Sequence, residues 1–323
     1  MTVREWVAHW QEVYDKLRSR PTTYAAHDYI FKNHILPSLG ERLLDDLTET
    51  AVGNFLENRK RFGSHRPESA GYPGLGDNTM RSIHRLLQQC LDQAVEDGKI
   101  EKNPARAFRY TKPKAAKANI LSALEIEDYL DTAAQLGYLP MFTLALTAGL
   151  RQGELIALKW SDLNVEAHML TIHEGRSVEC RELVEYAGGV RIISLPHQTV
   201  KLLEQEHARH PSSPYMFPHP GTLRPYSPNM ARLLHKRVTE QAGLDHVRFV
   251  DLRHTCAALA LQGGMEVEEL SKMLGHSRID MTRQNYAPYL SHKGRKKAKA
   301  PVVEVQSKEL AKASEQLGGL LKF

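Results

Sequence analysis

A lysine-rich segment at residues 111–118 (TKPKAAKA) constrains the fold most, because it divides the chain into two parts with different patterns. The segment holds a proline and no acidic residue, a composition typical of a solvated tether between domains. Before it, apolar residues recur only at helical spacing, whereas after it helices alternate with strand-like runs. The length of 323 residues also favours two cores, since one core tends to split beyond roughly 250–300 residues. We therefore predict domains at residues 1–110 and 121–290, a linker at 111–120 and a C-terminal tail at 291–323.

The first part of the chain is predicted to be a four-helix domain. Its apolar residues recur every three or four positions, as Trp6 and Trp10 do, which gathers them on one helical face. We expect helices at residues 4–18, 22–35, 48–61 and 77–98. Thr48 is predicted to cap the third helix, and either Asp77 or Asn78 the fourth.

The second domain is predicted to be mixed α+β. Ser122 and Glu125 have the spacing of a capping box at the start of its first helix. Residues 169–173 and 191–195 alternate like strands, with a strand or a loop between them and a turn at 188–189. Helical spacing covers residues 139–147, 152–158, 198–210, 228–242, 252–262, 267–274 and 281–286. The whole chain is therefore predicted to be mostly α, with one small antiparallel sheet.

The composition excludes several classes of protein. With 41% hydrophobic and 25% charged residues, the chain is typical of a globular protein and not of a disordered chain or a coiled-coil rod. Cys90, Cys180 and Cys256 are far apart, which argues against a disulfide framework and a structural zinc site. The N-terminus lacks the apolar core of a signal peptide, and the longest apolar stretch, residues 138–150, is too short to span a bilayer. We predict a cytoplasmic protein without a membrane partner.

The net charge of +5 permits a nucleic-acid partner without establishing one. Four short segments of the second domain are more informative. They are AGLRQGEL at residues 148–155, DLRHT at 251–255, LGHS at 274–277 and Tyr286 within QNYAPYL. Each alone has an ordinary structural interpretation, as an ion pair, a helix end or a packed aromatic ring. Their order and their separations carry more information than any one segment.

In this order, the four segments resemble the catalytic domain of the tyrosine recombinase (phage integrase) family. The similarity covers about residues 121–290 and includes KWSDL at 159–163. More loosely, the first domain resembles the family's SAM-like core-binding domain, including the Asn-Pro-Ala at residues 103–105 with which that domain ends.

The resemblance implies an enzyme that breaks and rejoins double-stranded DNA through a 3′-phosphotyrosyl intermediate. Arg151 and Arg253 would pair with phosphate oxygens, since a guanidinium offers parallel donors and stays charged. Tyr286 would be the nucleophile, and His276 would hold a non-bridging oxygen or the tyrosine proton. Glu154 would stabilise the site from the same helical face as Arg151. Because the transesterification conserves the bond energy in the protein–DNA link, the resemblance implies no cofactor and no metal.

The chain departs from the family's pattern at the histidine that usually lies three residues before the second arginine. Here that residue is Val250. Because valine cannot accept or donate a proton, His254, which directly follows Arg253, is the nearest substitute, and His246 is a poorer one.

The family's hairpin lysine is also missing, because no lysine lies between Lys159 and Lys201. The basic residues of that interval are Arg176, Arg181 and Arg191. From its position before the predicted turn at 188–189 we favour Arg181 as the replacement. An arginine can stabilise the charge of a leaving oxygen but is a poor proton donor.

Further candidates for DNA contact lie outside these segments. Four candidates lie at the start of the fourth helix: Asn78, Thr79, Arg81 and Arg85. The same residues would equally suit a solvated helix face. Those in the linker, which either follow a phosphate backbone or only solvate the tether, are Lys112, Lys114 and Lys117. The basic run at residues 293–299 is predicted to lead into a helix from about residue 307. By the resemblance that helix would pack on a neighbouring protomer; otherwise it is a frayed end.

The leading hypothesis is a site-specific recombinase that assembles as a tetramer on DNA, exchanges strands through a Holliday junction and serves a mobile element. An accessory factor that sets the direction is a further expected partner. The alternative is a catalytically impaired homologue that only binds DNA, motivated by Val250, the missing lysine and a turn at 263–264 between two helices. A type IB topoisomerase would share the chemistry, but the two-domain size and the LGHS segment favour recombination.

Overall fold

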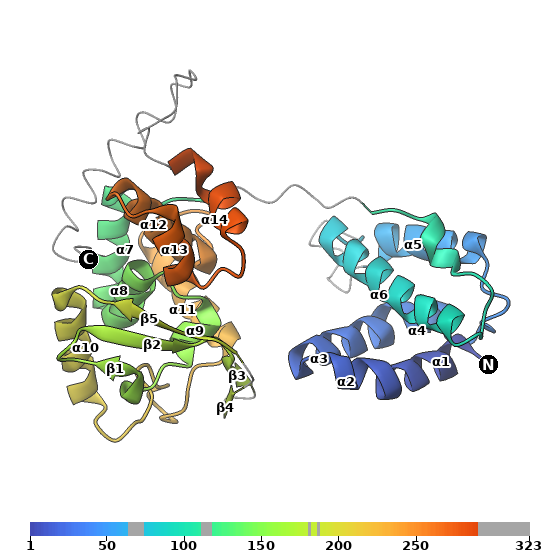
Figure 1. The fold of residues 1–323 in the computed structure, drawn as a ribbon, viewed down its shortest axis with the longest axis horizontal. Coiled ribbons are helices and arrows are strands. Elements are labelled where there is room, and N and C mark those ends of the chain that lie inside the picture. The colour runs from blue at the N-terminus through green and yellow to red at the C-terminus, as the bar shows by residue number, and fades with distance from the viewer. Residues whose placement is uncertain (64–73, 111–117, 180–181, 186–187, 290–323) are drawn as a thin grey trace, which may run out of the picture. The chain divides into compact units, whose positions relative to one another are not determined.

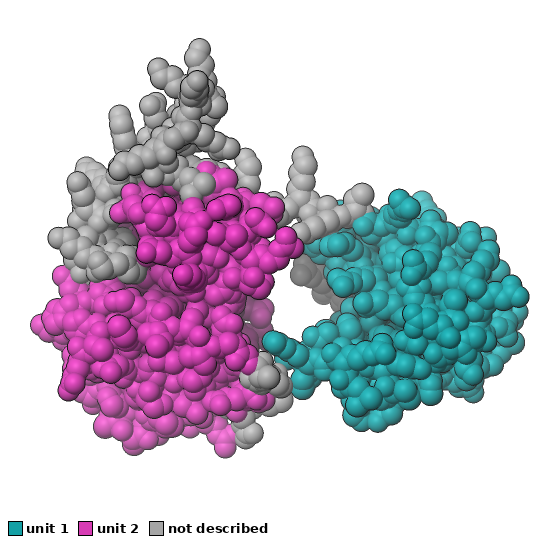
Figure 2. Space-filling model, in the orientation of Figure 1, with its two compact units in different colours: residues 1–116 teal, residues 117–323 magenta. Residues whose placement is uncertain are grey.

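A computed structural model of the protein describes residues 1–63, 74–110, 118–179, 182–185 and 188–289 (Figure 1). The chain forms two compact units, Met1–Ala116 and Lys117–Phe323, which Figure 2 distinguishes by colour. Each unit has its own apolar core. The three linker lysines, Arg181 and the C-terminal tail lie outside the described residues.

The helices and turns below make up the regular structure of residues 1–63 and 74–110, the described part of unit 1. Its first two helices each contain a central π-helical segment, and a 3-10 turn follows the last helix. The elements are α1 (Val3–Trp10), a π segment (Gln11–Asp15), α2 (Lys16–Arg18), α3 (Pro21–Ile30), a second π segment (Phe31–Ile35), α4 (Leu36–Leu39), α5 (Glu49–Phe62), α6 (Asp77–Glu96) and the 3-10 turn (Pro104–Ala107). Because α1 continues into α2 and α3 into α4, the four predicted helices are confirmed.

Aromatic side chains hold the helices of unit 1 together. Trp6 of α1 is fully buried, and its indole N–H donates to the Cys90 carbonyl of α6 at 3.0 Å. Trp10 packs edge to face on Phe31 with ring centroids 5.8 Å apart, which brings the first two helices together.

The helix caps of unit 1 follow the prediction in one case and depart from it in another. Thr48 caps α5, because its hydroxyl accepts from the Ala51 N–H at 3.2 Å. The N-cap of α6 is Gly76 and not Asp77 or Asn78, because the extended backbone ends at Gly76 and the helix already includes Asp77.

Unit 2 combines helices with short strands. Its first elements are α7 (Ala123–Gln135), α8 (Leu139–Ala148), α9 (Gln152–Ile156), a 3-10 turn (Trp160–Asp162), β1 (Leu163–Asn164), β2 (Met169–His173), β3 (Arg176–Glu179), β4 (Glu182–Glu185) and β5 (Val190–Ser194). They are followed by α10 (His197–Arg209), α11 (Pro228–Gln241), α12 (Phe249–Gln262), α13 (Val267–Leu274), α14 (Ile279–Tyr286) and a 3-10 turn (Ala287–Tyr289).

The sheet of unit 2 has the strand order β1-β2-β5, and its pairs are antiparallel, so the small predicted sheet is confirmed. Thr171 of β2 lies opposite Ile192 of β5. The chain between these two strands forms a separate hairpin of β3 and β4, with Arg176 opposite Glu185.

The interior of unit 2 is organised around α8, which is buried from Pro140 to Ala148. A helix that is apolar on all sides belongs in the interior, and α7, α10 and α12 pack against it. At the start of α7, Ser122 and Glu125 exchange the two hydrogen bonds of the predicted capping box.

The helix α12 begins at Phe249, three residues before the predicted start. The carboxylate of Asp251 accounts for the earlier start, because it accepts from the Arg248 backbone N–H at 2.9 Å and so satisfies the first turn. The sequence pattern missed this start because arginine is not a typical N-cap residue.

Candidate active site

Arg151 lies at the junction of α8 and α9. Its backbone is extended (φ −68°, ψ 149°), so it is the N-cap of α9 and not a residue of the helix. Glu154 reaches back from the first turn: its Oε2 accepts from the Arg151 backbone N–H at 2.8 Å and its Oε1 from Arg151 Nη1 at 2.7 Å. The two side chains therefore meet, but not on one helical face as their spacing predicted.

Arg253 is buried within α12 and points at the ends of two other helices. Its Nη1 donates to the Gly149 carbonyl at 2.8 Å and its Nη2 to the Leu274 carbonyl at 2.6 Å. Both acceptors lie at helix C-termini, where the partial negative charge of the helix stabilises a cation. Gly149 has φ 58°, and a Cβ there would lie 2.9 Å from Leu274 Cδ2, so glycine is required at this position.

Arg191 of β5 is a third arginine of the site that the sequence did not single out. Its Nη2 donates to Glu154 Oε2 at 2.7 Å, its Nη1 to Glu154 Oε1 at 3.0 Å and its Nε to the Met273 carbonyl at 2.9 Å. Only 9% of its side chain is exposed. The sequence does show an arginine within an apolar strand beside the predicted turn, which could have indicated Arg191. The search for a replacement of the family's lysine favoured Arg181 instead.

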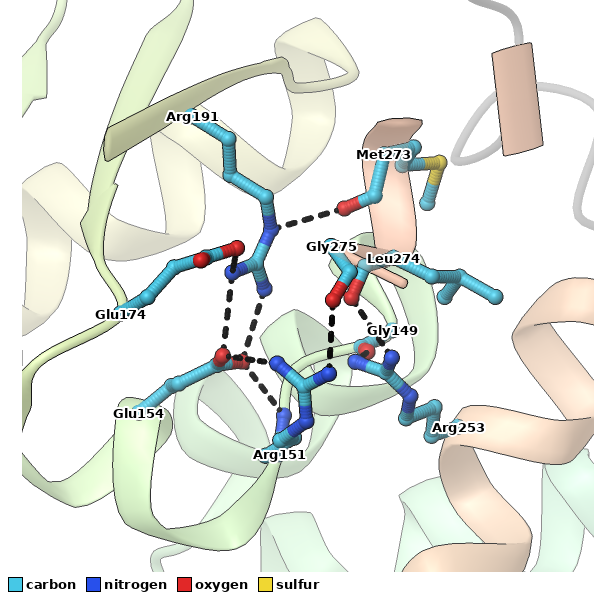
Figure 3. Close-up of polar contacts among 9 residues, drawn as sticks. All are labelled: Gly149, Arg151, Glu154, Glu174, Arg191, Arg253, Met273, Leu274 and Gly275. Carbon is cyan, nitrogen blue, oxygen red and sulfur yellow. Dashed lines mark hydrogen bonds and ion pairs between the residues drawn. The ribbon is translucent and has the colours of Figure 1, made fainter. Parts of the chain in front are cut away.

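The three guanidinium groups converge on the last turn of α13 (Figure 3). The carbonyls of three consecutive residues each accept from a different arginine. Met273 accepts from Arg191, Leu274 from Arg253 and Gly275 from Arg151. Gly275 ends the helix with φ 65°, and a Cβ there would lie 2.9 Å from Arg191 Nη1. The close approach of the arginines therefore also depends on a glycine.

Positive charge exceeds negative charge in this cluster. Of its three arginines, Arg151 bonds the carboxylate of Glu154 and Arg191 those of Glu154 and Glu174, whereas Arg253 bonds backbone carbonyls. Burial, and next the charge of Arg151, lower the pKa of Arg253 to about 10. The charges of Arg151 and Arg253 repel each other, and the carboxylates of the cluster do not balance them. Such a site is suited to an anion.

Tyr286 lies at the end of α14 and is 1% exposed. Its hydroxyl is 2.8 Å from Nδ1 of His254, the residue that follows Arg253 on α12. Burial raises the pKa of Tyr286 to about 12, against the opposing charge of Arg253, and burial lowers the pKa of His254. The ordinary state is therefore a neutral phenol beside a neutral imidazole, and Nδ1 accepts the phenolic hydrogen in the tautomer with its proton on Nε2.

His276 follows Gly275, and its Nδ1 is 2.7 Å from the hydroxyl of Thr282, one turn before Tyr286 on α14. Burial, and then the charges of Arg253 and Arg151, lower the pKa of His276 to about 4. The histidine that meets the tyrosine hydroxyl is thus His254, whereas His276 meets a threonine.

The other predicted residues are distributed over both units. Val250 is 45% exposed on the first turn of α12. The candidates at the start of α6 in unit 1, of which only Arg81 is partly buried, are Asn78, Thr79, Arg81 and Arg85. In the described part of the chain, no group of three or more His, Cys, Asp or Glu side chains could hold a metal ion. No described helix has both the length and the apolar character needed to cross a membrane.

Comparison with known protein families identifies the class of protein. The profile of the phage integrase family matches residues 118–292, and the profile of the phage integrase N-terminal SAM-like domain matches residues 2–58. Since the first match alone covers more than half of the chain, the protein belongs to the phage integrase family.

Relatives and solved structures support this assignment. The ICEBs1 integrase of Bacillus subtilis (strain 168) is 23% identical over 300 residues, which are 88% of this chain and 78% of that protein. A protein named tyrosine recombinase XerC-like, from Caldanaerobacter subterraneus subsp. tengcongensis, is 24% identical over 252 residues, or 66% of this chain. The chain spans only 63% of the length of that relative.

Two solved structures have the same fold. The Tn1549 transposon integrase in complex with a circular intermediate DNA superposes with a TM-score of 0.73 at 17% identity, over 88% of this chain and 95% of that one. A lambda integrase tetramer bound to a Holliday junction gives 0.69 at 18% identity, over 86% and 78%.

Proposed function

We propose that the protein is a site-specific DNA recombinase that cuts and rejoins DNA through a covalent bond to Tyr286. The carrying observation is a cluster of guanidinium groups held by backbone carbonyls, close to a buried tyrosine whose hydroxyl meets a histidine. Cleavage of a phosphodiester needs positive charge for its oxygens and a nucleophile with a proton acceptor. Membership of the family supports the same reaction, and the names of the relatives favour it over an impaired, DNA-binding homologue.

Arg151 and Arg253 are proposed to bind the non-bridging oxygens of the scissile phosphate. The side chain of Arg151 is 46% exposed, so a phosphate can reach it, and Arg253 adds its charge from the buried side. His276 is neutral above a pH of about 4. If its Nδ1 accepts from Thr282, its Nε2 carries a hydrogen that can be donated to a phosphate oxygen.

The first step forms a bond between Tyr286 Oη and phosphorus while His254 takes the phenolic proton at Nδ1. The bond from phosphorus to the 5′-oxygen breaks, which leaves a 3′-phosphotyrosyl link. Arg181 is proposed to stabilise the charge of the leaving oxygen, which takes its proton from water because arginine does not release one. Attack of a 5′-hydroxyl on the link reverses the step and restores the tyrosine, so no energy-rich cofactor is needed.

Contact with double-stranded DNA is proposed for the start of α6 and for the linker, through the residues predicted from the sequence. Assembly as a homotetramer is proposed from the lambda integrase tetramer on a Holliday junction, whose fold this chain shares. The protein is further proposed to integrate or excise a mobile element in the cytoplasm, as the similarity to the transposon and ICEBs1 integrases suggests. An accessory factor is proposed to set the direction of the reaction.

A suicide substrate tests the proposal. Nicked duplexes with a randomised core are incubated with the protein, and a covalent adduct is sought on a denaturing gel. The wild type is expected to form an adduct that Tyr286→Phe lacks, because only the hydroxyl is removed. Binding of DNA by the wild type without any adduct would contradict the enzyme and support the impaired, DNA-binding alternative.

A further inference from the structure

We propose that Arg191 is a positioning residue for this reaction: it holds Glu154 against Arg151 and holds the last turn of α13, so that the phosphate-binding groups keep one geometry. The inference rests on the proposed function. It concerns a residue that is not expected to touch the DNA, because its guanidinium is already paired with two carboxylates, those of Glu154 and Glu174.

Arg151 and Arg191 share the carboxylate of Glu154. Each oxygen of Glu154 accepts from both arginines: Oε1 from the Nη1 atoms of Arg151 and Arg191, and Oε2 from the Arg151 backbone N–H and Arg191 Nη2. A bidentate pair between a guanidinium and a carboxylate fixes the plane and direction of both groups. Arg191 therefore decides where Glu154 lies, and Glu154 decides where the exposed Arg151 lies.

Arg191 also contacts the end of α13. Arg191 Nε donates to the Met273 carbonyl, two residues before the Gly275 carbonyl that Arg151 reaches. His276 follows directly, so the same turn carries a proposed phosphate ligand. The single side chain of Arg191 thus joins the strand β5 to the α9 carboxylate and to the turn before His276 (Figure 3).

Arg191 also stabilises the charged form of Glu154. Burial acts to raise the pKa of Glu154, but the hydrogen bonds and charge of Arg191, followed by the contacts with Arg151, outweigh it and keep the pKa below its usual value. Without Arg191, the buried carboxylate of Glu154 would keep one cationic hydrogen-bond partner within the described residues, which is Arg151. Its hold on Arg151 would then depend on that single pair, and protonation of the carboxylate would release the guanidinium.

The chain offers a matched control in Arg176 of β3. Its side chain is 8% exposed against 9% for Arg191, and it too bonds two carboxylates, those of Asp162 and Glu185. Asp162 belongs to the 3-10 turn before β1 and Glu185 to β4, so Arg176 is not part of the arginine cluster. Replacing either arginine by methionine removes one buried charge of the same kind.

The kinetic experiment compares Arg191→Met, Arg191→Lys and Arg176→Met in single-turnover adduct formation at saturating DNA, with DNA affinity and Tm measured alongside. Arg191→Met is expected to slow adduct formation by about 10- to 100-fold, as loss of a group that orients a ligand residue commonly does. Arg191→Lys should recover part of the rate, because it keeps the charge but not the fork. Arg176→Met should lower Tm to a similar extent. Its rate should stay within about threefold of the wild-type rate, because, among the described residues, Arg176 shares no hydrogen-bond partner with the arginine cluster.

A pH profile separates positioning from general damage. In Arg191→Met the burial of Glu154 is opposed by Arg151 alone, so its pKa rises and the carboxylate becomes protonated at a higher pH than in the wild type. The ratio of variant to wild-type rate should therefore fall as the pH is lowered from about 8 to about 5.5. A constant ratio, or an equal rate loss in Arg176→Met, would overturn the inference.

A second measurement needs no cleavage. Side-chain 15N NMR of the DNA-free protein reports how fast the guanidinium hydrogens of Arg151 exchange with water. They are expected to be protected in the wild type and in Arg176→Met and to exchange faster in Arg191→Met. Unchanged protection would overturn the positioning role even if the wild type cuts DNA. Lost protection in a protein that forms no adduct would instead fault the proposed function and leave the positioning role standing.

Discussion

Unit 2 contains two networks built on buried arginines, and they differ in what holds the guanidinium groups. Arg176 of β3 is held by the carboxylates of Asp162 in the 3-10 turn and Glu185 of β4, which cancel its charge. In the candidate site, Arg253 is held by the carbonyls of Gly149 and Leu274, which fix its position but carry no net charge. A buried cation held by dipoles alone remains available to an anion, whereas a buried cation between two carboxylates is already neutralised.

This difference separates a structural ion pair from a binding site more clearly than burial or residue type does. Arg176, Arg191 and Arg253 are all buried arginines on regular elements of the same unit. Arg191 is intermediate, because it bonds the carboxylates of Glu154 and Glu174 and one backbone carbonyl as well. Its mixed contacts fit a residue that orders the site without binding the ligand.

The largest expected effect tests the comparison directly. Arg253→Ala and Arg151→Ala should each reduce adduct formation by about 100- to 1,000-fold or more, as removal of a transition-state donor commonly does. Affinity for DNA should be largely kept, because most of the protein–DNA contacts lie elsewhere. Gel assays of adduct and of binding measure both; a loss of binding as large as the loss of cleavage would count against the assignment.

The next effect concerns the proton acceptor. His254→Ala should slow adduct formation by about 100-fold, within the range of general base catalysis. In the wild type, the rate should fall as the pH drops through the pKa of His254, which burial has lowered, because the protonated ring cannot accept the phenolic hydrogen. A rate profile that is the same in the wild type and in His254→Ala would show that another group takes the proton.

A smaller effect concerns the carbonyl that holds Arg253. Gly149→Ala should destabilise the protein more than Gly137→Ala, although both glycines have positive φ (58° and 78°). A Cβ at Gly137 meets nothing within 4 Å, so its cost is the conformational one of about 1–2 kcal/mol. At Gly149 the Cβ also meets Leu274 and Cys256. Thermal unfolding measures both variants, and equal losses would mean that the contact with Leu274 is not tight.

The smallest effect is on how the stability of the protein depends on pH. The folded pKa of His276, about 4, lies below the value of about 6.5 for an unfolded chain, so unfolding favours proton uptake. This histidine contributes stability that is fully present above pH about 6.5 and is lost as the pH falls toward 4. In His276→Gln the decrease in Tm between neutral pH and about pH 5 should be smaller than in the wild type. An unchanged decrease would contradict the lowered pKa.

Much of the fold could be predicted from the sequence, because it depends on local patterns. Helical periodicity located the helices of unit 1, and alternation located β2 and β5. The start of α12 and the N-cap of α6 were missed, because an N3 carboxylate and the backbone of Gly76 set these boundaries. The sequence left open a strand or a loop between β2 and β5, where the structure has the hairpin of β3 and β4, since short strands without clear alternation have little signal of their own.

The candidate site was predictable as a set of residue types but not as a geometry. The order of the motifs identified Arg151, Arg253, His276 and Tyr286. That Tyr286 meets His254 depends on how α14 packs near α12. That Arg191 joins the cluster depends on the register of β5 beside the end of α13. Contacts of this kind arise between elements far apart in the chain, where a single sequence carries no pattern.

The most direct test of the central claim is mass spectrometry of the covalent adduct. The wild-type protein is trapped on a nicked duplex and digested with nuclease and protease. The account predicts a nucleotide joined through its 3′-phosphate to the peptide that contains Tyr286, and its loss in Tyr286→Phe. A nucleotide on the neighbouring Tyr289, a 5′-phosphate link, or bound DNA without any modified peptide would contradict it.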